Sequence, residues 1–318
     1  MKIKQTLTGK SVFFERLTQS VENTGFLMLR FLHFLIKIKN ERIMHMNNTN
    51  KKIVAIGGGK NGRIKSDGTY EPYETGPMDL EIIKLTGKKN PNFLFLAHAQ
   101  ETEEAQDKYF ETMENIYDKR YGCKCRHLKS KDLYNKNLVK EMVEWSDIIY
   151  EGGGNTLDMI KMWKEAGFDK TLRQAWESGK VMCGVSAGAN CWFKECSSDS
   201  LKIKYGDDQP LIGMECLGFI DGLFVPHCDA PGRRENVKEL LKTSNQVGLS
   251  MSNCTALEIV DDKYRLIISD ASYHGIEAYG LKSYWDNGKY LEKKIDDSNV
   301  FKPLEELLSK YEKKNESE

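Results

Sequence analysis

Short apolar runs recur along the chain, and most of them end at glycine or at a polar turn. Runs of four or five apolar residues bounded in this way are typical of strands that are buried on both faces of a parallel sheet. The first such run stops at Gly57-Gly58-Gly59, and a later one stops at Gly152-Gly153-Gly154. The sequence therefore predicts buried strands at residues 53–56, 93–97, 125–128, 147–150 and 181–185.

The stretches between these runs carry apolar residues at helical spacing. Pro77 opens one stretch, at a position where a helix tolerates its missing N–H. The pattern predicts helices that begin near residues 77 and 102, and others around 138–145, 156–163 and 170–178. Strands and helices that alternate in this way predict an α/β fold with a mostly parallel sheet and helices on both faces. Ligands of such sheets bind beyond the carboxyl ends of the strands.

The pattern changes after residue 200. A glycine-punctuated apolar stretch, 217–225, leads to Pro226-His227, and a helix is expected from residue 234 to about 243. Two further apolar runs, 256–260 and 264–268, flank a short polar turn and predict a hairpin.

Three regions are expected along the chain. Residues 1–51 form a basic extension, since residues 1–52 hold ten Lys or Arg and three Glu. Its apolar stretch, 26–36, is shorter than the roughly 20 residues that a bilayer span needs, so no membrane span is expected. Residues 52–312 contain no linker and are expected to form one domain, followed by a charged tail at 313–318.

Composition excludes some classes of function. The 318 residues include 47 basic and 47 acidic side chains, and a nucleic-acid-binding protein would usually show a basic excess. The 8 cysteines are dispersed, without the paired spacing of a zinc site. We therefore expect reduced thiols, a cytoplasmic location, no metal and no cofactor.

One motif carries a clear chemical meaning. Gly184-Val185-Ser186-Ala187-Gly188 follows a predicted strand and fits G-x-S-x-G, the nucleophile elbow. In this turn the serine hydroxyl projects above the sheet, and the backbone N–H of the next residue points toward a developing oxyanion. Ser186 is therefore the predicted nucleophile, and Ala187 a predicted oxyanion donor.

A serine nucleophile needs a base, and the base needs a group that orients it. Of the 6 histidines, His227 lies downstream of Ser186 at an expected strand end and is the preferred base. His98 follows another predicted strand and is the second candidate. The orienting acid stays open at this point among four residues: Asp199, Glu195, Asp229 and Glu258.

The glycine turn at Gly152–Thr156 is a second functional candidate. It lacks the Gly-Lys-Ser/Thr of a P-loop, so a phosphate site is disfavoured. If its strand lies beside the elbow strand, a glycine N–H of this turn could supply the other oxyanion donor. Gly57-Gly58-Gly59 either lines the same cleft or forms a tight turn.

These motifs together resemble the peptidase E (aspartyl dipeptidase) family of serine peptidases over roughly residues 52–280. The resemblance rests on Gly152–Thr156, on the elbow with Ala189 and Asn190, and on Pro226-His227. It implies a fold like that of class I glutamine amidotransferases, related to the flavodoxin-like sandwich. It also implies Ser186 as nucleophile, His227 as base, and Gly154 and Ala187 as oxyanion donors. The third member implied is Asp199, with Glu195 open.

The resemblance further implies metal-independent hydrolysis of small peptides, typically dipeptides with an N-terminal aspartate. Arg233 and Arg234 are then candidates for binding the aspartate, with Asn155 as a further substrate contact. The chain departs from the family at Cys191-Trp192-Phe193 and around Asp199, which puts aspartate specificity in doubt. The alternatives are a cyanophycinase-like hydrolase of aspartyl polymers and a non-catalytic binding protein on the same fold. A homodimer is the expected assembly.

Overall fold

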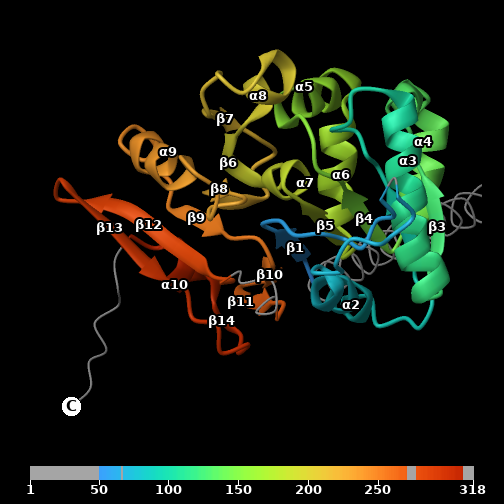
Figure 1. The fold of residues 1–318 in the computed structure, drawn as a ribbon. Coiled ribbons are helices and arrows are strands. Elements are labelled where there is room, and N and C mark those ends of the chain that lie inside the picture. The colour runs from blue at the N-terminus through green and yellow to red at the C-terminus, as the bar shows by residue number, and fades with distance from the viewer. Residues whose placement is uncertain (1–49, 66, 271–276, 311–318) are drawn as a thin grey trace, which may run out of the picture. The chain divides into compact units, whose positions relative to one another are not determined.

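The computed structural model describes residues 50–65, 67–270 and 277–310 (Figure 1). The predicted basic extension lies outside these residues except for its last two positions, and so does the predicted tail at 313–318. Everything below concerns the described part of the chain.

An eight-stranded sheet forms the centre of the fold, in the order β14-β11-β10-β1-β5-β4-β2-β3. The five strands at its β3 end run parallel, and the other three add to β1 in antiparallel fashion. The parallel strands are β1 (Lys52–Ile56), β2 (Asn92–Phe95), β3 (Lys124–His127), β4 (Ile148–Glu151) and β5 (Val181–Val185). The antiparallel strands are β10 (Thr255–Val260), β11 (Lys263–Ile268) and β14 (Lys302–Pro303). The predicted strands and the predicted hairpin are thus present.

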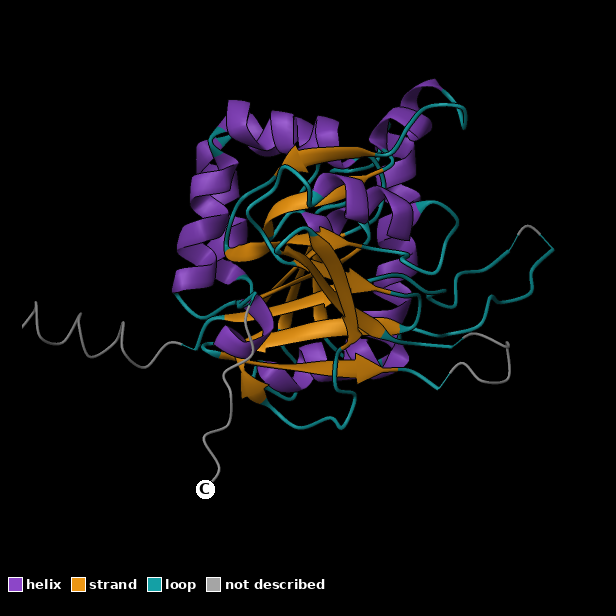
Figure 2. Cartoon of the chain, turned by 90° about the vertical axis from the view of Figure 1, so that its left-hand side faces the viewer, coloured by secondary structure: helices purple, strands orange, loops and turns teal. Residues whose placement is uncertain are grey.

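Helices cover both faces of this sheet, as Figure 2 shows with strands in orange between helices in purple. Val54 and Ile56 pack into one apolar cluster, whereas Ile53 and Ala55 pack into another on the opposite face. A strand that is buried on both sides needs a continuous apolar run, which explains the pattern in the sequence. The helices are α2 (Gly76–Leu85), α3 (Glu103–Glu114), which continues into the π-helical η1 (Asn115–Arg120), η2 (Ser130–Tyr134), α4 (Lys136–Trp145), α5 (Thr156–Ala166), α6 (Phe168–Glu177) and the short α7 (Ala187–Asn190). The predicted α/β fold is confirmed.

A second, six-stranded sheet has the order β13-β12-β9-β8-β6-β7. Within it β6, β8 and β9 are parallel neighbours, and β8 is the strand predicted before His227. Its strands are β6 (Phe193–Ser198), β7 (Ile212–Glu215), β8 (Ile220–Val225), β9 (Gly248–Met251), β12 (Gly280–Asp286) and β13 (Lys289–Lys294), and the remaining helices are α8 (Ser200–Tyr205), α9 (Arg233–Leu240) and α10 (Leu304–Leu308). The sequence pattern did not indicate that these strands form a sheet of their own.

Close backbone contact fixes the turn that follows β5. A methyl group on Gly184 would lie 2.6 Å from the carbonyl oxygen of Glu151. A methyl group on Gly188 would lie 2.0 Å from that same oxygen and 2.9 Å from the carbonyl oxygen of Gly152. Both glycines of the elbow are therefore required by the approach of the neighbouring turn after β4.

The side chain of Glu151 ties that neighbouring turn to the end of β2. It is fully buried, and its Oε1 accepts hydrogen bonds of 3.1 Å from the N–H groups of Ala99 and Gly152. Its Oε2 is buried without a hydrogen-bond partner in the described structure. Burial raises the pKa of Glu151 to about 8, because a buried carboxylate loses its hydration. The carboxyl group is therefore mostly neutral in the folded protein at neutral pH.

We expect Gly188→Ala to destabilise the fold by more than about 2 kcal/mol, because its methyl group would overlap a backbone oxygen that cannot move away freely. Thermal and urea unfolding measure the change. Gly153→Ala is the matched control, since its methyl group would lie at an ordinary 3.6 Å from Cβ of Ser186. Equal stability of the two variants would contradict this account of the turn.

We expect Glu151→Gln to gain stability relative to the wild type as the pH rises. The folded pKa of about 8 lies above the ordinary value of 4.5, so the contribution of Glu151 is fully present below 4.5 and is lost as the pH rises toward 8. Between these pH values the difference in free energy of unfolding between Glu151→Gln and the wild type should change by about 1.4 kcal/mol per pH unit. Melting curves of both proteins from pH 5 to pH 9 measure it, and parallel curves would refute the buried neutral carboxyl.

Candidate active site

Ser186 occupies the tight turn between β5 and α7. Its backbone has φ 55° and ψ −111°, a conformation that is strained for a residue with a side chain. The two flanking glycines and the start of α7 hold this conformation in place. The hydroxyl does not cap the helix, so it is not committed to the hydrogen bond that a serine at this position usually makes.

His227 is brought to the same place by the end of β1. The N–H of Ser186 donates a 3.0 Å hydrogen bond to the carbonyl of Ile56, and the N–H of His227 donates a 3.0 Å bond to the carbonyl of the next residue, Gly57. His227 also has a positive φ, 49°, directly beyond β8. The end of β1 thus joins the predicted nucleophile on one sheet to the predicted base on the other.

The imidazole of His227 is oriented by Asn253. Its Nδ1 lies 2.8 Å from Oδ1 of Asn253. Asp229 in turn accepts bonds of 2.8 Å from Nδ2 and 2.9 Å from the backbone N–H of Asn253. A carboxylate only accepts, so Asp229 fixes which end of the amide faces it, and Oδ1 must accept a proton from Nδ1. This arrangement leaves Nε2 of His227 as the unprotonated nitrogen.

The glycine turn after β1 makes room for this pair. A methyl group on Gly58 would lie 2.1 Å from Oδ1 of Asn253 and 2.3 Å from Nδ1 of His227. Gly57 and Gly58 therefore line the site, which decides between the two roles open for this turn. Burial lowers the pKa of His227, and the hydrogen bond that Nδ1 donates to Asn253 only partly offsets this by raising the pKa. The neutral imidazole, the form that acts as a base, is thereby favoured.

Two backbone N–H groups remain available beside Ser186. A methyl group on Gly153 would lie 3.6 Å from Cβ of Ser186, so this turn adjoins the serine. The N–H of Gly153 donates to the Tyr109 hydroxyl and that of Asn155 to a backbone carbonyl, but among the described residues the N–H of Gly154 has no acceptor. Ala187 is the first residue of α7, where an N–H has no partner within the helix. Both predicted oxyanion donors thus have N–H groups without an acceptor among the described residues.

Asp199 lies near His227 but is bound to another residue. Its charge raises the pKa of the imidazole. Its carboxylate forms a 2.7 Å ion pair with Arg233, which is 5% exposed. The hydrogen bond at Nδ1 of His227 is made by Asn253 and not by Asp199, whose place as the third member stays a prediction.

The other candidate acids differ in their distance from the histidine. Glu195 is opposite Leu223 in the parallel pair β6–β8, and Leu223 precedes His227 by four residues. Glu258 is buried on β10 and forms a 2.7 Å ion pair with Arg265. Asp229, which was among the open alternatives, is the carboxylate that reaches the histidine, through Asn253.

The predicted substrate contacts are engaged in other interactions. Arg233 pairs with Asp199, and Arg234 pairs with Glu292 of β13. Oδ1 of Asn155 caps α5 by accepting from the N–H of Asp158 at 3.1 Å.

His98, the second candidate base, is part of the core. Its Nδ1 accepts a 2.9 Å bond from the Trp163 indole, so its Nε2 carries the proton that is donated to the carbonyl of Leu128 at 2.7 Å. Burial lowers the pKa of His98 to about 3, and neither ring nitrogen is available as a base.

Asn253 is the site residue that the sequence reasoning missed. It follows β9 by two positions, at the carboxyl end of a strand that runs parallel to β8. The available signal was the polar pair Ser252-Asn253, which follows the short and only partly apolar stretch 247–251. It was not recognised because the strand was not predicted.

The described residues contain neither a metal-binding cluster nor a membrane-spanning helix. No three His, Cys, Asp or Glu side chains gather there in a way that could hold a metal ion. None of the helices described is long and apolar enough to cross a bilayer.

The sequence is similar to those of known peptidases. The model of peptidase family S51 matches residues 64–267. A Bacillus subtilis protein described as the uncharacterized peptidase YgaJ is 31% identical over 232 residues, which cover 72% of this chain and 91% of the relative. Peptidase E of Salmonella arizonae is 28% identical over 127 residues, or 36% of this chain and 52% of that protein.

A solved structure supports the fold. The crystal structure of a peptidase from an acI-B1 actinobacterium superposes with a TM-score of 0.57 and 18% identity, over 79% of this chain and 96% of that one. The family match spans more than half of the sequence and includes the elbow, the glycine turn after β4 and His227. The chain therefore belongs to peptidase family S51, the serine peptidases that include peptidase E.

Proposed function

We propose that this peptidase hydrolyses short peptides without a metal ion, through an acyl-enzyme on Ser186 with His227 as general base. The observation that carries the proposal is the tautomer of His227. The chain Asp229–Asn253–His227 holds the proton on Nδ1 and leaves Nε2 free to accept one. The strained turn at Ser186, joined to the same end of β1, supports the pairing.

The proposed reaction has two halves. Nε2 of His227 takes the hydroxyl proton as Oγ of Ser186 attacks the peptide carbonyl, whose oxygen becomes negative and accepts bonds from the N–H groups of Gly154 and Ala187. The C–N bond then breaks, and His227 returns the proton to the leaving amine. Water attacks the acyl-enzyme in the same way, so the products are a free carboxylate and regenerated Ser186.

We propose Asn253, rather than Asp199, as the residue that orients His227. Asn253 makes the hydrogen bond to Nδ1, whereas the Asp199 carboxylate is paired with the buried guanidinium of Arg233. Asp199 acts on His227 only through its charge, which raises the pKa of the imidazole less than burial lowers it.

A preference for an N-terminal aspartate stays a proposal, and it requires Arg233 or Arg234 to exchange its present partner for the substrate. Arg233 and Arg234 already pair with carboxylates of the chain, so a substrate carboxylate would have to displace Asp199 or Glu292. The free N–H groups and the oriented base favour a catalyst over a non-catalytic binding protein on this fold.

Ser186→Ala should lower kcat on a dipeptide library by at least about a thousandfold, because the acyl-enzyme cannot form. A serine-reactive phosphonate should label the wild type and not this variant, as intact-mass spectrometry would report. Ser178→Ala is the matched control, at the opposite end of β5 from the elbow. A folded wild type that takes no label and cleaves no peptide would support the binding-protein alternative.

Replacement of Asn253 tests the orienting role. Activity requires neutral His227 and falls as the pH drops through its pKa, and the lowered pKa puts this acid limb below 6.5. Asn253→Ala should lower kcat by about a hundredfold, since the tautomer is no longer fixed. It should also shift the limb to lower pH, because it removes a bond that raises the pKa. A pH–rate profile measures both effects. An equal loss of kcat in Asp199→Asn, at unchanged melting temperature, would assign the role to Asp199.

A further inference from the structure

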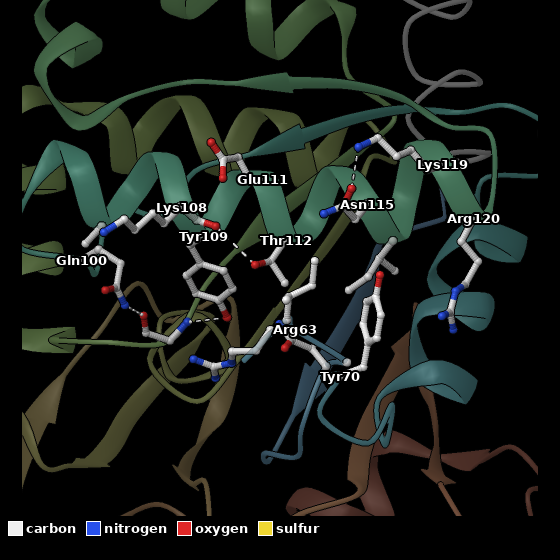
Figure 3. Close-up of a pocket in the computed structure, with 16 residues that line it drawn as sticks. Arg63, Tyr70, Gln100, Lys108, Tyr109, Glu111, Thr112, Asn115, Lys119 and Arg120 are labelled. Atoms are coloured by element: carbon white, nitrogen blue, oxygen red, sulfur yellow. Dashed lines mark hydrogen bonds between the residues drawn. The ribbon is translucent and has the colours of Figure 1, made fainter. Parts of the chain in front are cut away.

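A cleft opens directly beside the proposed oxyanion turn. It has a volume of about 850 Å³ and lies between the loop from β1 to α2 and the helix formed by α3 and η1 (Figure 3). Gly153 lines one end of it, and Arg120 of η1 lines it farther along the helix. In Figure 3, Arg63 and Tyr70 of the loop face the row of helix side chains.

The wall of the cleft and the oxyanion turn are one hydrogen-bonded unit. Nε2 of Gln100 donates a 2.6 Å bond to the carbonyl of Gly153, and the N–H of Gly153 donates a 3.4 Å bond to the Tyr109 hydroxyl. Gln100 and Tyr109 also line the cleft. Gly153 directly precedes Gly154, the proposed oxyanion donor, so the cleft adjoins the oxyanion turn.

The cleft is lined by more positive than negative side chains. Arg63, Lys108, Lys119 and Arg120 stand against a single acid, Glu111. Two of these cations have carboxylate partners outside the lining: Arg63 pairs with Glu71, and Lys108 pairs with Glu104.

The two cations of η1 are differently placed. Nζ of Lys119 donates a 2.6 Å bond to Oδ1 of Asn115, and the Arg120 guanidinium stacks 4.3 Å from the centre of the Tyr73 ring. Neither forms an ion pair within the part of the chain that the structure describes. A carboxylate of a ligand could therefore bind at this end without displacing one of the protein.

The length of the cleft bears on the size of its ligand. From Tyr109 to Arg120 the helix advances by about 16 Å, at roughly 1.5 Å per residue. An extended peptide covers about 3.3 Å per residue, so this distance accommodates about five residues. A dipeptide at Ser186 would leave most of it empty.

We propose that this cleft binds an extended acidic peptide of about five residues, so that the substrates of this peptidase include acidic oligopeptides longer than dipeptides. The inference rests on the proposed hydrolysis at Ser186. Lys119 and Arg120 select for carboxylates, and Gln100 and Tyr109 hold the catalytic turn beside the bound chain. The cyanophycinase-like alternative would act on a polyaspartate that bears arginine side groups. That polymer carries a guanidinium beside each carboxylate, so a cationic cleft favours it less than a peptide with net negative charge.

The test compares two pentapeptides of the same length, one rich in Asp and Glu and one with Asn and Gln in their places. The wild type should cleave the acidic peptide with a kcat/KM at least about tenfold higher. The variant Lys119→Gln/Arg120→Gln should lower this preference by about tenfold, through KM and not kcat. Both residues are exposed at the surface, so the fold should tolerate the change. Lys140→Gln, on the exposed side of α4, is the matched control. Added salt should also weaken the preference.

The two proposals can fail separately. Cleavage of dipeptides, with equal kcat/KM for both pentapeptides or with the preference unchanged in the double variant, overturns the cleft assignment and leaves Ser186 chemistry intact. Fluorescence anisotropy with labelled pentapeptides on Ser186→Ala gives a readout that needs no turnover. Selective binding of the acidic peptide there, with no hydrolysis by the wild type, would retain the cleft and reject the proposed function. Equal binding of both peptides would reject the cleft.

Discussion

Two hydrogen bonds at the end of β1 determine how the rest of the site is arranged. Ser186 belongs to the large sheet and His227 to the small one, yet their N–H groups bond to consecutive carbonyls, those of Ile56 and Gly57. Backbone bonds of this kind do not depend on side-chain rotamers, so they fix the spacing of the two residues firmly. The positive φ angles of Ser186 and His227 fit this constraint. Directly after β5 and β8 the backbone must turn sharply so that the N–H groups of the two residues reach the carbonyls of Ile56 and Gly57. The stability of both sheets compensates for the strain.

Burial has a consistent electrostatic effect around this junction. It favours the neutral form of His227 and of Glu151 alike, although one is a base and the other an acid. Burial lowers the local dielectric, and in such a site two backbone N–H dipoles act more strongly on a developing oxyanion than they would in water. Of the cations that line the cleft, Lys119 and Arg120 lie on η1, farther along the helix from Gly153. Under the proposed function they would bind a substrate carboxylate there without placing a charge beside the reacting carbonyl.

The features that could be predicted from the sequence are those that depend on residues close together in the chain. The buried strands, the glycine turns and the elbow each follow from a few adjacent residues, as with Gly184 and Gly188, whose spacing is required by a single backbone contact. The smaller sheet depends on pairing between segments far apart in sequence, such as β6 with β8 and β9 with β12. Its strands are short and only partly apolar, so the local pattern of apolar residues did not predict this sheet. Asn253 was missed for this reason, because its meaning comes from β9 lying beside β8.

The identity of the orienting residue also has a chemical reason. An amide cannot neutralise an imidazolium as a carboxylate does, so an Asn beside His227 would stabilise the charged intermediate less well on its own. Asp229 lies behind Asn253 and binds both its side-chain amide and its backbone N–H. Polarisation along this chain strengthens each bond, and the negative charge stays near solvent, where it needs no buried partner. A carboxylate placed directly against Nδ1 would have to be desolvated in the narrow space beside Gly58. The chain from Asp229 through Asn253 therefore fixes the tautomer of His227 with the neutral amide of Asn253. It keeps the negative charge of Asp229 one residue away from the imidazole.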